Sequence, residues 1–399
     1  MDWVFSDRIS GITGTATREI MKLTADPSVI SLAGGMPGSE CFPVDQIRAI
    51  TEDILASGRA ARTLQYGVTT GYNSTREAVR GYIKDIGVDT ESIENILIVS
   101  GGQQGLDLMC KAFLNKGDVV LVEDPTYLAF LQIVAGYEAV PVGVRSNPDG
   151  LDIGDLEAKI KRYKPKLLYV VPNFSNPTGK TYTAQNRQKI AETTAKYGVV
   201  IIEDDPYGRL RYEGEDVAPL YTFCGGNCVY VSSFSKVISP GIRLGFCTGP
   251  KEIIRKLEIG KQGSDVHSSH MSQLIAEQFI TRGLFPTHLN YIKSVYRAKK
   301  DVMVAALDKY MPAKFKYEKA QGGLFIWGGF DEAAGIDTVE LFPRAVEHKV
   351  AYVYGNVFYA DGSGRNMLRL NFSQPTCENL EKGVKALGGM FNSAAAYKA

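Results

Sequence analysis

A lysine flanked by hydroxyl groups and an arginine is the segment of this chain best suited to chemistry. Ser232, Ser233 and Ser235 come just before Lys236, and Arg243 follows seven residues later. A deprotonated amine attacks a carbonyl, while hydroxyls and a guanidinium suit a bound phosphate. The segment therefore predicts a site for pyridoxal phosphate, with its aldehyde on the lysine. The alternative is a surface loop, because short motifs often occur by chance.

Two acids and a tyrosine follow a run of β-branched residues upstream. Residues 199–202 are Val, Val, Ile and Ile, and they predict a parallel strand buried on both faces. Ligands bind at the carboxyl ends of such strands, so Asp204 is placed to keep a ring nitrogen protonated. Tyr207 can donate its phenol to the ring oxygen. Asp205 can instead cap the following turn.

A third segment places an amide at the same edge of the sheet. Residues 166–171 predict a strand, and Pro172 and Asn173 lead to Asn176-Pro177-Thr178-Gly179. The last four residues form a turn on any interpretation. Because the turn follows a buried strand and precedes the Asp204 strand, we expect Asn176 to bind the ring oxygen of the cofactor.

A glycine-rich turn provides a phosphate site. It comprises residues 100–105, between a strand at residues 96–99 and a helix whose apolar residues recur at helical spacing. Such a turn exposes backbone N–H groups and the positive end of the helix dipole. The spacing matches neither a P-loop nor a dinucleotide fingerprint, so a nucleotide site is not favoured. Gln104 can instead be a simple surface residue.

In order and spacing, these segments resemble the pyridoxal-phosphate-dependent aspartate-aminotransferase-like superfamily, fold type I, over nearly the whole chain. Residues 31–38, 65–67 and 202–207 are most similar to its 2-aminoadipate/kynurenine aminotransferase branch. The resemblance implies an α/β fold, with a large, mostly parallel, doubly wound sheet and a smaller α/β domain built from both termini. It also implies an aminotransferase that moves an amino group between an L-amino acid and a 2-oxo acid such as 2-oxoglutarate. The implied donors are 2-aminoadipate, glutamate, and aromatic or branched aliphatic amino acids.

The same resemblance assigns roles to individual residues. Lys236 would form the Schiff base, Asp204 would pair with the pyridine nitrogen, and Arg369 would bind the substrate α-carboxylate. Catalytic roles fall on Lys236, Asp204 and Tyr207. The other implied cofactor contacts come from Gly102, Gln103, Tyr127, Asn176, Tyr207, Ser233, Ser235 and Arg243. Relatives usually carry serine where this chain has Gly102, so one hydroxyl contact to the phosphate is lost.

Further implied contacts come from distant parts of the sequence. Gly35 and Asn176 would touch the substrate. Tyr66 would reach the cofactor and substrate of the neighbouring subunit, which implies a homodimer with shared sites. Arg18 would pair with the distal carboxylate of a dicarboxylic donor, although a solvated helix arginine explains it equally simply.

A chain of 399 residues exceeds the usual size of one core, so two domains are expected. Strands and helices alternate over residues 43–285, which predicts the large domain. Residues 286–399 predict the small domain, which a long helix at 289–310 joins to the large one, and residues 1–42 are expected to pack with it. Residues 392–399 are expected to be a disordered tail.

Composition narrows the function further. The net charge is +1 without a long basic run, so a nucleic-acid groove is not expected. No apolar run is long enough to span a membrane, and the start lacks the basic residues of a signal peptide. The six cysteines are scattered, which predicts reduced thiols in a cytoplasmic protein, and no metal site is expected.

Three alternatives remain at this point. A pyridoxal-phosphate lyase acting at Cβ shares the fold and nearly the same cofactor residues. A non-catalytic cofactor-binding protein would need them too, although every expected reactive residue is present. A transcription regulator that fuses a winged helix to this fold is disfavoured, because the expected module begins within the first 10–30 residues or so.

Overall fold

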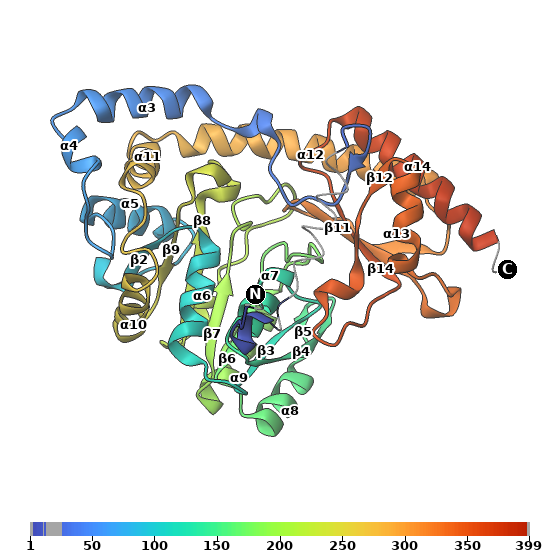
Figure 1. The fold of residues 1–399 in the computed structure, drawn as a ribbon, viewed down its shortest axis with the longest axis horizontal. Coiled ribbons are helices and arrows are strands. Elements are labelled where there is room, and N and C mark those ends of the chain that lie inside the picture. The colour runs from blue at the N-terminus through green and yellow to red at the C-terminus, as the bar shows by residue number, and fades with distance from the viewer. Residues whose placement is uncertain (1–2, 11, 13–25, 397–399) are drawn as a thin grey trace.

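The computed structural model describes residues 3–10, 12 and 26–396. Two sheets dominate the described part, a large one in the N-terminal two thirds and a smaller one near the C-terminus (Figure 1). The expected site residues lie where the two sheets approach each other, so their arrangement decides the geometry of the site.

The large sheet has the strand order β2-β9-β8-β7-β6-β3-β4-β5. Strands β8, β7, β6, β3 and β4 run parallel to their neighbours in this group, whereas β9 pairs antiparallel with both β2 and β8. The strands are β2 (Ile96–Val99), β3 (Val119–Asp124), β4 (Val140–Asn147), β5 (Gly150–Leu151), β6 (Leu167–Val170), β7 (Val200–Asp204), β8 (Cys228–Ser233) and β9 (Gly245–Thr248). The mostly parallel sheet confirms the predicted fold class.

Helices cover both faces of this sheet because its strands are apolar on both sides. Successive side chains of a strand point to opposite faces, and Leu168 accordingly packs in a different hydrophobic cluster from Leu167 and Tyr169. One face packs against α8 (Ile153–Tyr163) and α9 (Ala184–Tyr197), and the other against α6 (Gly102–Phe113), α7 (Leu128–Gly136) and α10 (Lys251–Gln262). Helix α5 (Asn73–Lys84) contacts β2 at the edge of the sheet and α11 (His270–Thr281), which in turn packs on α3 (Val44–Ala56), and α3 contacts α4 (Ala60–Thr63).

The second sheet is antiparallel, with the order β10-β11-β14-β13. Its strands are β10 (Phe315–Tyr317), β11 (Phe325–Phe330), β13 (Val353–Tyr354) and β14 (Met367–Asn371), and its helices are α13 (Thr338–Glu347) and α14 (Cys377–Ala396). The expected long helix is α12 (Phe285–Tyr310), which packs along α14 (Figure 1). Near the N-terminus, β1 (Ile30–Ser31) pairs with β12 (Val350–Ala351). The exact domain limits stay a prediction.

The expectation of a disordered tail is wrong for residues 392–396. Helix α14 continues to Ala396 because Phe391 and Ala394 extend its apolar stripe into the core. Asn392 also donates a hydrogen bond of 3.2 Å to the backbone oxygen of Tyr310. Alanine has the highest helix propensity, so the run of small residues favours the helix.

Candidate active site

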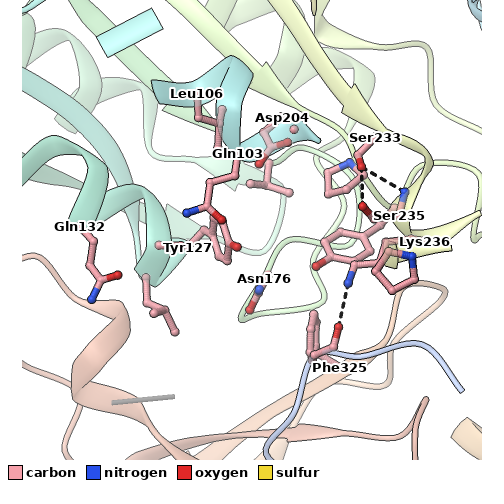
Figure 2. A pocket seen from close by; sticks show the side chains of 18 of the residues that line it. Gln103, Leu106, Tyr127, Gln132, Asn176, Asp204, Ser233, Ser235, Lys236 and Phe325 are labelled. Carbon is pink, nitrogen blue, oxygen red and sulfur yellow. Dashed lines mark hydrogen bonds between the residues drawn. The ribbon is translucent and has the colours of Figure 1, made fainter. Parts of the chain in front are cut away.

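A cavity of about 610 Å³ lies at the carboxyl ends of β6, β7 and β8, facing Phe325 and Arg369 of the second sheet. Twelve of the residues singled out from the sequence line it: Gly35, Gly102, Gln103, Tyr127, Asn176, Asp204, Tyr207, Ser233, Ser235, Lys236, Arg243 and Arg369. Figure 2 shows several of them converging from separate elements. The fold therefore brings together segments that are up to 334 residues apart (369 − 35).

Lys236 lies at the end of a short 3₁₀ turn directly after β8. The hydroxyl of Ser233 accepts a 3.0 Å hydrogen bond from the Ser235 N–H and caps this turn, which fixes the start of the lysine side chain. The Nζ atom donates to the backbone oxygen of Gly35 at 2.8 Å (Figure 2). Burial, together with the positive charges of Arg369 and Arg243, lowers the pKa of Lys236 to about 8. The uncharged fraction of the amine near neutral pH is therefore larger than in an ordinary lysine, and the uncharged amine is the nucleophile.

Asp204 ends β7 and is buried in the cavity wall. Its Oδ2 atom accepts a 2.8 Å hydrogen bond from the hydroxyl of Tyr169. Burial, and to a lesser degree the charge of Asp205, raises the pKa of Asp204 to about 7. A cation placed beside this carboxylate would stabilise its charged form, so the residue suits a protonated ring nitrogen.

Sequence analysis missed Tyr169. It belongs to β6, two residues before the position that would pair with Asp204, and therefore lies on the same face of the sheet. Its position on the same face as Asp204 could have been inferred from the alternation of side chains along neighbouring strands.

Asn176 links the two polar ends of the cavity. Its Oδ1 atom accepts a 2.7 Å hydrogen bond from Nη1 of Arg369, and its side chain also hydrogen-bonds Tyr207. Burial raises the pKa of Tyr207 well above its ordinary value and that of Tyr127 to about 12. Both phenols therefore stay protonated at neutral pH and act as neutral donors or as walls for a ring.

The phosphate end gathers the donors expected from the sequence. Gly102 is the first residue of α6, and the hydroxyls of Ser233 and Ser235 lie 2.8 Å apart. The guanidinium of Arg243 donates to the backbone oxygen of Ser100 at 3.3 Å. Gly101 has φ of 87°, a conformation that glycine adopts without strain, and the Arg243 Nη2 atom lies 2.7 Å from where a Cβ would be. A helix N-terminus, two hydroxyls and a guanidinium suit a phosphate dianion.

Arg369 lies on β14 with almost no exposed surface. Its Nη2 atom donates to the backbone oxygen of Ala33 at 2.6 Å, and the guanidinium stacks over Phe325, 4.3 Å from the ring centre. The Nε atom is buried and has no hydrogen-bond partner among the described residues. Burial lowers the pKa of Arg369 to about 10, which leaves it charged at neutral pH. A buried cation held by neutral oxygens suits a carboxylate ligand.

Two other residues that the structure describes fall outside the cavity. Asp205 caps the following turn as the sequence suggested, accepting 2.8 Å hydrogen bonds from the Gly208 N–H and the Tyr230 hydroxyl. Tyr66 is 81% exposed between α4 and α5, so the structure does not place it in this chain's own cavity. Arg18 lies outside the described residues.

Several cavity residues had no counterpart in the sequence analysis. Apart from Tyr169, they are mainly apolar walls and one amide, namely Ile12, Met36, Leu106, Leu128, Gln132 and Phe325. Their types carry no chemical signal, so only the fold identifies them. Within residues 3–10, 12 and 26–396, no helix meets the length and hydropathy needed to cross a bilayer, and no three His, Cys, Asp or Glu side chains gather as metal ligands would.

The residues present fit pyridoxal phosphate. An amine of lowered pKa, a buried carboxylate and a phosphate cradle line a single cavity. These are the groups needed to bind the aldehyde, the ring nitrogen and the phosphate of that cofactor.

Comparisons with known proteins agree with this geometry. Aromatic-amino-acid aminotransferase 1 of Thermococcus litoralis is 38% identical, over 96% of this chain and 93% of that protein. The 2-aminoadipate transaminase of Thermus thermophilus is 35% identical, over 94% of each chain. The crystal structure of Pyrococcus horikoshii kynurenine aminotransferase in complex with PMP has a TM-score of 0.93 at 36% identity, covering 98% of this chain and 97% of that one.

The family model of class I and II aminotransferases matches residues 29–387 of this chain. The resemblance, the fold type and the cofactor predicted from the sequence are confirmed by these matches. The chain belongs to the aminotransferase class I and II family and is a pyridoxal-phosphate-dependent aminotransferase of fold type I.

Proposed function

We propose that this aminotransferase takes 2-aminoadipate, glutamate, and aromatic or branched aliphatic L-amino acids as donors, with 2-oxoglutarate among its acceptors. The observation that carries the proposal is the single cavity in which Lys236, Asp204 and Arg369 meet. The relatives named for aromatic amino acids and for 2-aminoadipate support the range of donors.

Each charged residue has a separate task in this proposal. Arg369 binds the α-carboxylate of the substrate, because its planar fork matches a carboxylate and its Nε donor is still unpaired among the described residues. Lys236 would hold the cofactor aldehyde, and its amine would move the proton at the substrate Cα. Bound pyridoxal phosphate supplies the electron sink that makes this proton acidic. The carboxylate of Asp204 would place a negative charge beside the ring nitrogen and so favour its protonated form.

The remaining contacts orient the ring. Asn176 and Tyr207 would hold the ring oxygen, Tyr127 would form a wall for the ring, and Gly35 would border the substrate. The phosphate is held by Gly102, Gln103, Ser233, Ser235 and Arg243.

The side-chain end of the substrate separates the classes of donor. The cavity wall contains Ile12, Leu106 and Leu128, which suits aromatic and aliphatic side chains. We assign the distal carboxylate of a dicarboxylic donor to Arg18. A panel of amino donors with 2-oxoglutarate tests this. Arg18→Ala should lower kcat/KM for glutamate and 2-aminoadipate by a factor equivalent to about 2–5 kcal/mol, while sparing leucine. An equal, small loss for every donor would exclude Arg18 from the site.

We also propose a homodimer in which Tyr66 completes the partner's site. The support is its exposure of 81%, next to Leu64 at 75% and Val68 at 56%. Exposed apolar side chains that cluster within five residues are typical of an interface. A cytoplasmic location stays a prediction based on the scattered cysteines.

Mixed dimers test the shared site. A chain with Tyr66→Ala and a chain with Lys236→Ala should each be inactive, but their heterodimer should regain one working site. Heterodimers of wild-type and Lys236→Ala chains provide the reference activity. If Tyr66 served its own chain, both sites of the mixed dimer would stay defective.

A further inference from the structure

A second buried lysine lies beneath the glycine-rich turn. Lys261, in the last turn of α10, has no exposed surface. Its Nζ atom donates to Oδ1 of Asp265 at 2.7 Å, to Oε1 of Gln104 at 2.8 Å and to the hydroxyl oxygen of Ser268 at 3.0 Å. The lysine therefore has a full set of acceptors and takes no part in lining the cavity.

The same acceptors also hold Ser100, the residue just before Gly101 and Gly102. The Ser100 N–H donates to Oε1 of Gln104 at 2.7 Å, and its hydroxyl donates to Oδ2 of Asp265 at 2.6 Å. That hydroxyl also lies 3.0 Å from the hydroxyl of Ser268. Because the Ser100 backbone oxygen accepts from Arg243, each polar group of this serine is engaged.

The network is anchored on its far side as well. Gln273 donates from Nε2 to the backbone oxygen of Ser268 at 2.8 Å, and its Oε1 atom accepts from the Tyr72 N–H at 2.8 Å. Lys261 and its acceptors thus connect the turn at residues 100–102 to the start of α11 and the segment before α5. These are parts of the scaffold rather than mobile side chains.

Such a network has a geometric rather than an energetic advantage. A buried ion pair adds little net stability over apolar side chains of the same size. Two adjacent glycines, however, lose much backbone entropy when a ligand orders them. A turn that is fixed before the ligand arrives avoids that loss at the moment of binding.

We propose that Lys261 is a positioning residue that holds the Ser100–Gly102 turn in the conformation that binds the cofactor phosphate. The inference rests on the proposed assignment of this turn and of Arg243 to the phosphate. Lys261 touches neither substrate nor cofactor and acts through Gln104, Asp265 and Ser268.

The test compares two ligands that differ only in the phosphate. Apo-protein is titrated with pyridoxal phosphate and with pyridoxal. The readout is the dissociation constant of pyridoxal divided by that of pyridoxal phosphate, and this ratio narrows when the phosphate contributes less to binding. Lys261→Met should weaken pyridoxal phosphate about tenfold or more, the size expected when hydrogen bonds to a charged group are lost, and pyridoxal less than about twofold. Lys256→Met is the matched control, because Lys256 is an exposed lysine on the same helix.

A second variant covers the case in which Lys261→Met fails to fold. Ser100→Ala removes only the hydroxyl that joins the turn to Asp265 and Ser268, and should narrow the ratio in the same direction. At saturating pyridoxal phosphate, the control variant Lys256→Met should keep kcat within a few-fold of wild type. Equal weakening of both ligands, or no change in either variant, would overturn the inference.

Arg243→Leu separates this inference from the proposed function. If Arg243→Leu narrows the ratio but Lys261→Met and Ser100→Ala do not, Lys261 has no positioning role and the phosphate assignment stands. If none of the three narrows the ratio, the phosphate assignment fails and the inference fails with it.

Discussion

Lys236 is partly buried and Lys261 has no exposed surface, and the two amines have opposite surroundings. Burial, followed by the positive charges of Arg369 and Arg243, lowers the pKa of Lys236 to about 8, and its amine donates to a single backbone oxygen. Lys261 meets a carboxylate, an amide and a hydroxyl, and burial lowers its pKa while the ion pair with Asp265 opposes the shift. The comparison teaches that polar partners, rather than burial alone, decide whether a lysine is reactive or structural.

The largest effect is expected from the two neighbouring acids, which show the same contrast. Asp204 has one hydroxyl donor in the cavity wall, whereas Asp205 is bound by a backbone N–H and a hydroxyl outside it. Asp204→Asn should lower kcat about a hundredfold or more, because a preorganised charge at the reacting centre is lost. Asp205→Asn should keep kcat within a few-fold and lower the free energy of unfolding by about 1–3 kcal/mol, measured in urea.

Apo-protein stability gives the control for Asp204. The pKa of this carboxyl is about 7 in the folded chain against an ordinary value of 3.8. The folded state therefore binds more protons between these values, and this group reduces stability as pH rises through that window. Apo Asp204→Asn should match apo wild type near pH 4 and be more stable at pH 8. A less stable variant at pH 8 would show that Asp204 is structural, like Asp205.

The pH dependence of pyridoxal phosphate uptake distinguishes the two lysines, and we expect an effect of intermediate size. Only an uncharged amine attacks the cofactor aldehyde, so the rate at which apo-protein takes up pyridoxal phosphate should rise with pH through about 8. Arg369→Gln removes a positive charge and should move this inflection to higher pH, because the charged form of Lys236 becomes less unfavourable. Stopped-flow absorbance measures the rate.

Lys261→Met is the reference for this profile. It should leave the inflection in place, since Lys261 is not among the charges that shift Lys236. If Lys261→Met moved the inflection and Arg369→Gln did not, Lys261 rather than Arg369 would set the pKa of the reactive amine.

The smallest effect concerns the cavity face of the turn that Lys261 supports. A Cβ at Gly102 would lie 3.6 Å from Cβ of Ser233, an ordinary contact distance. Gly102→Ser should therefore be tolerated and should restore one hydroxyl contact to the phosphate. Equilibrium dialysis should show pyridoxal phosphate retained about two- to tenfold more tightly, the gain from one hydrogen bond. Weaker retention would mean that the hydroxyl does not reach the phosphate.

The reactive side of the molecule could largely be predicted from the sequence. Asn176, Asp204 and Lys236 follow strands whose carboxyl ends meet at one edge of a parallel sheet, so strand order in the sequence brings them together. Arg369 could not be placed that way, because the pairing of β11 with β14 depends on contacts between distant residues. Its position came only from the resemblance.

The hydrogen-bond network around Lys261 could not be predicted from the sequence, for a physical reason. Lys261 occurs in a helix rich in charged residues and resembles a solvated lysine by type. Its spacing from Ile254 and Leu257 does place it on the buried stripe, but the acceptors that make burial favourable come from residues 100–104 and 265–268. Local periodicity cannot identify Gln104, the acceptor that lies 157 residues away in the sequence.

Trapping the cofactor lysine tests the central claim most directly. Holoenzyme is reduced with borohydride and digested, and the pyridoxyl group is located by mass spectrometry. The account predicts the label on Lys236 alone, and none at the remaining lysines, Lys261 included, in a Lys236→Ala variant. A label on Lys261 or on any other lysine of the wild-type protein would contradict the assignment of the reactive amine.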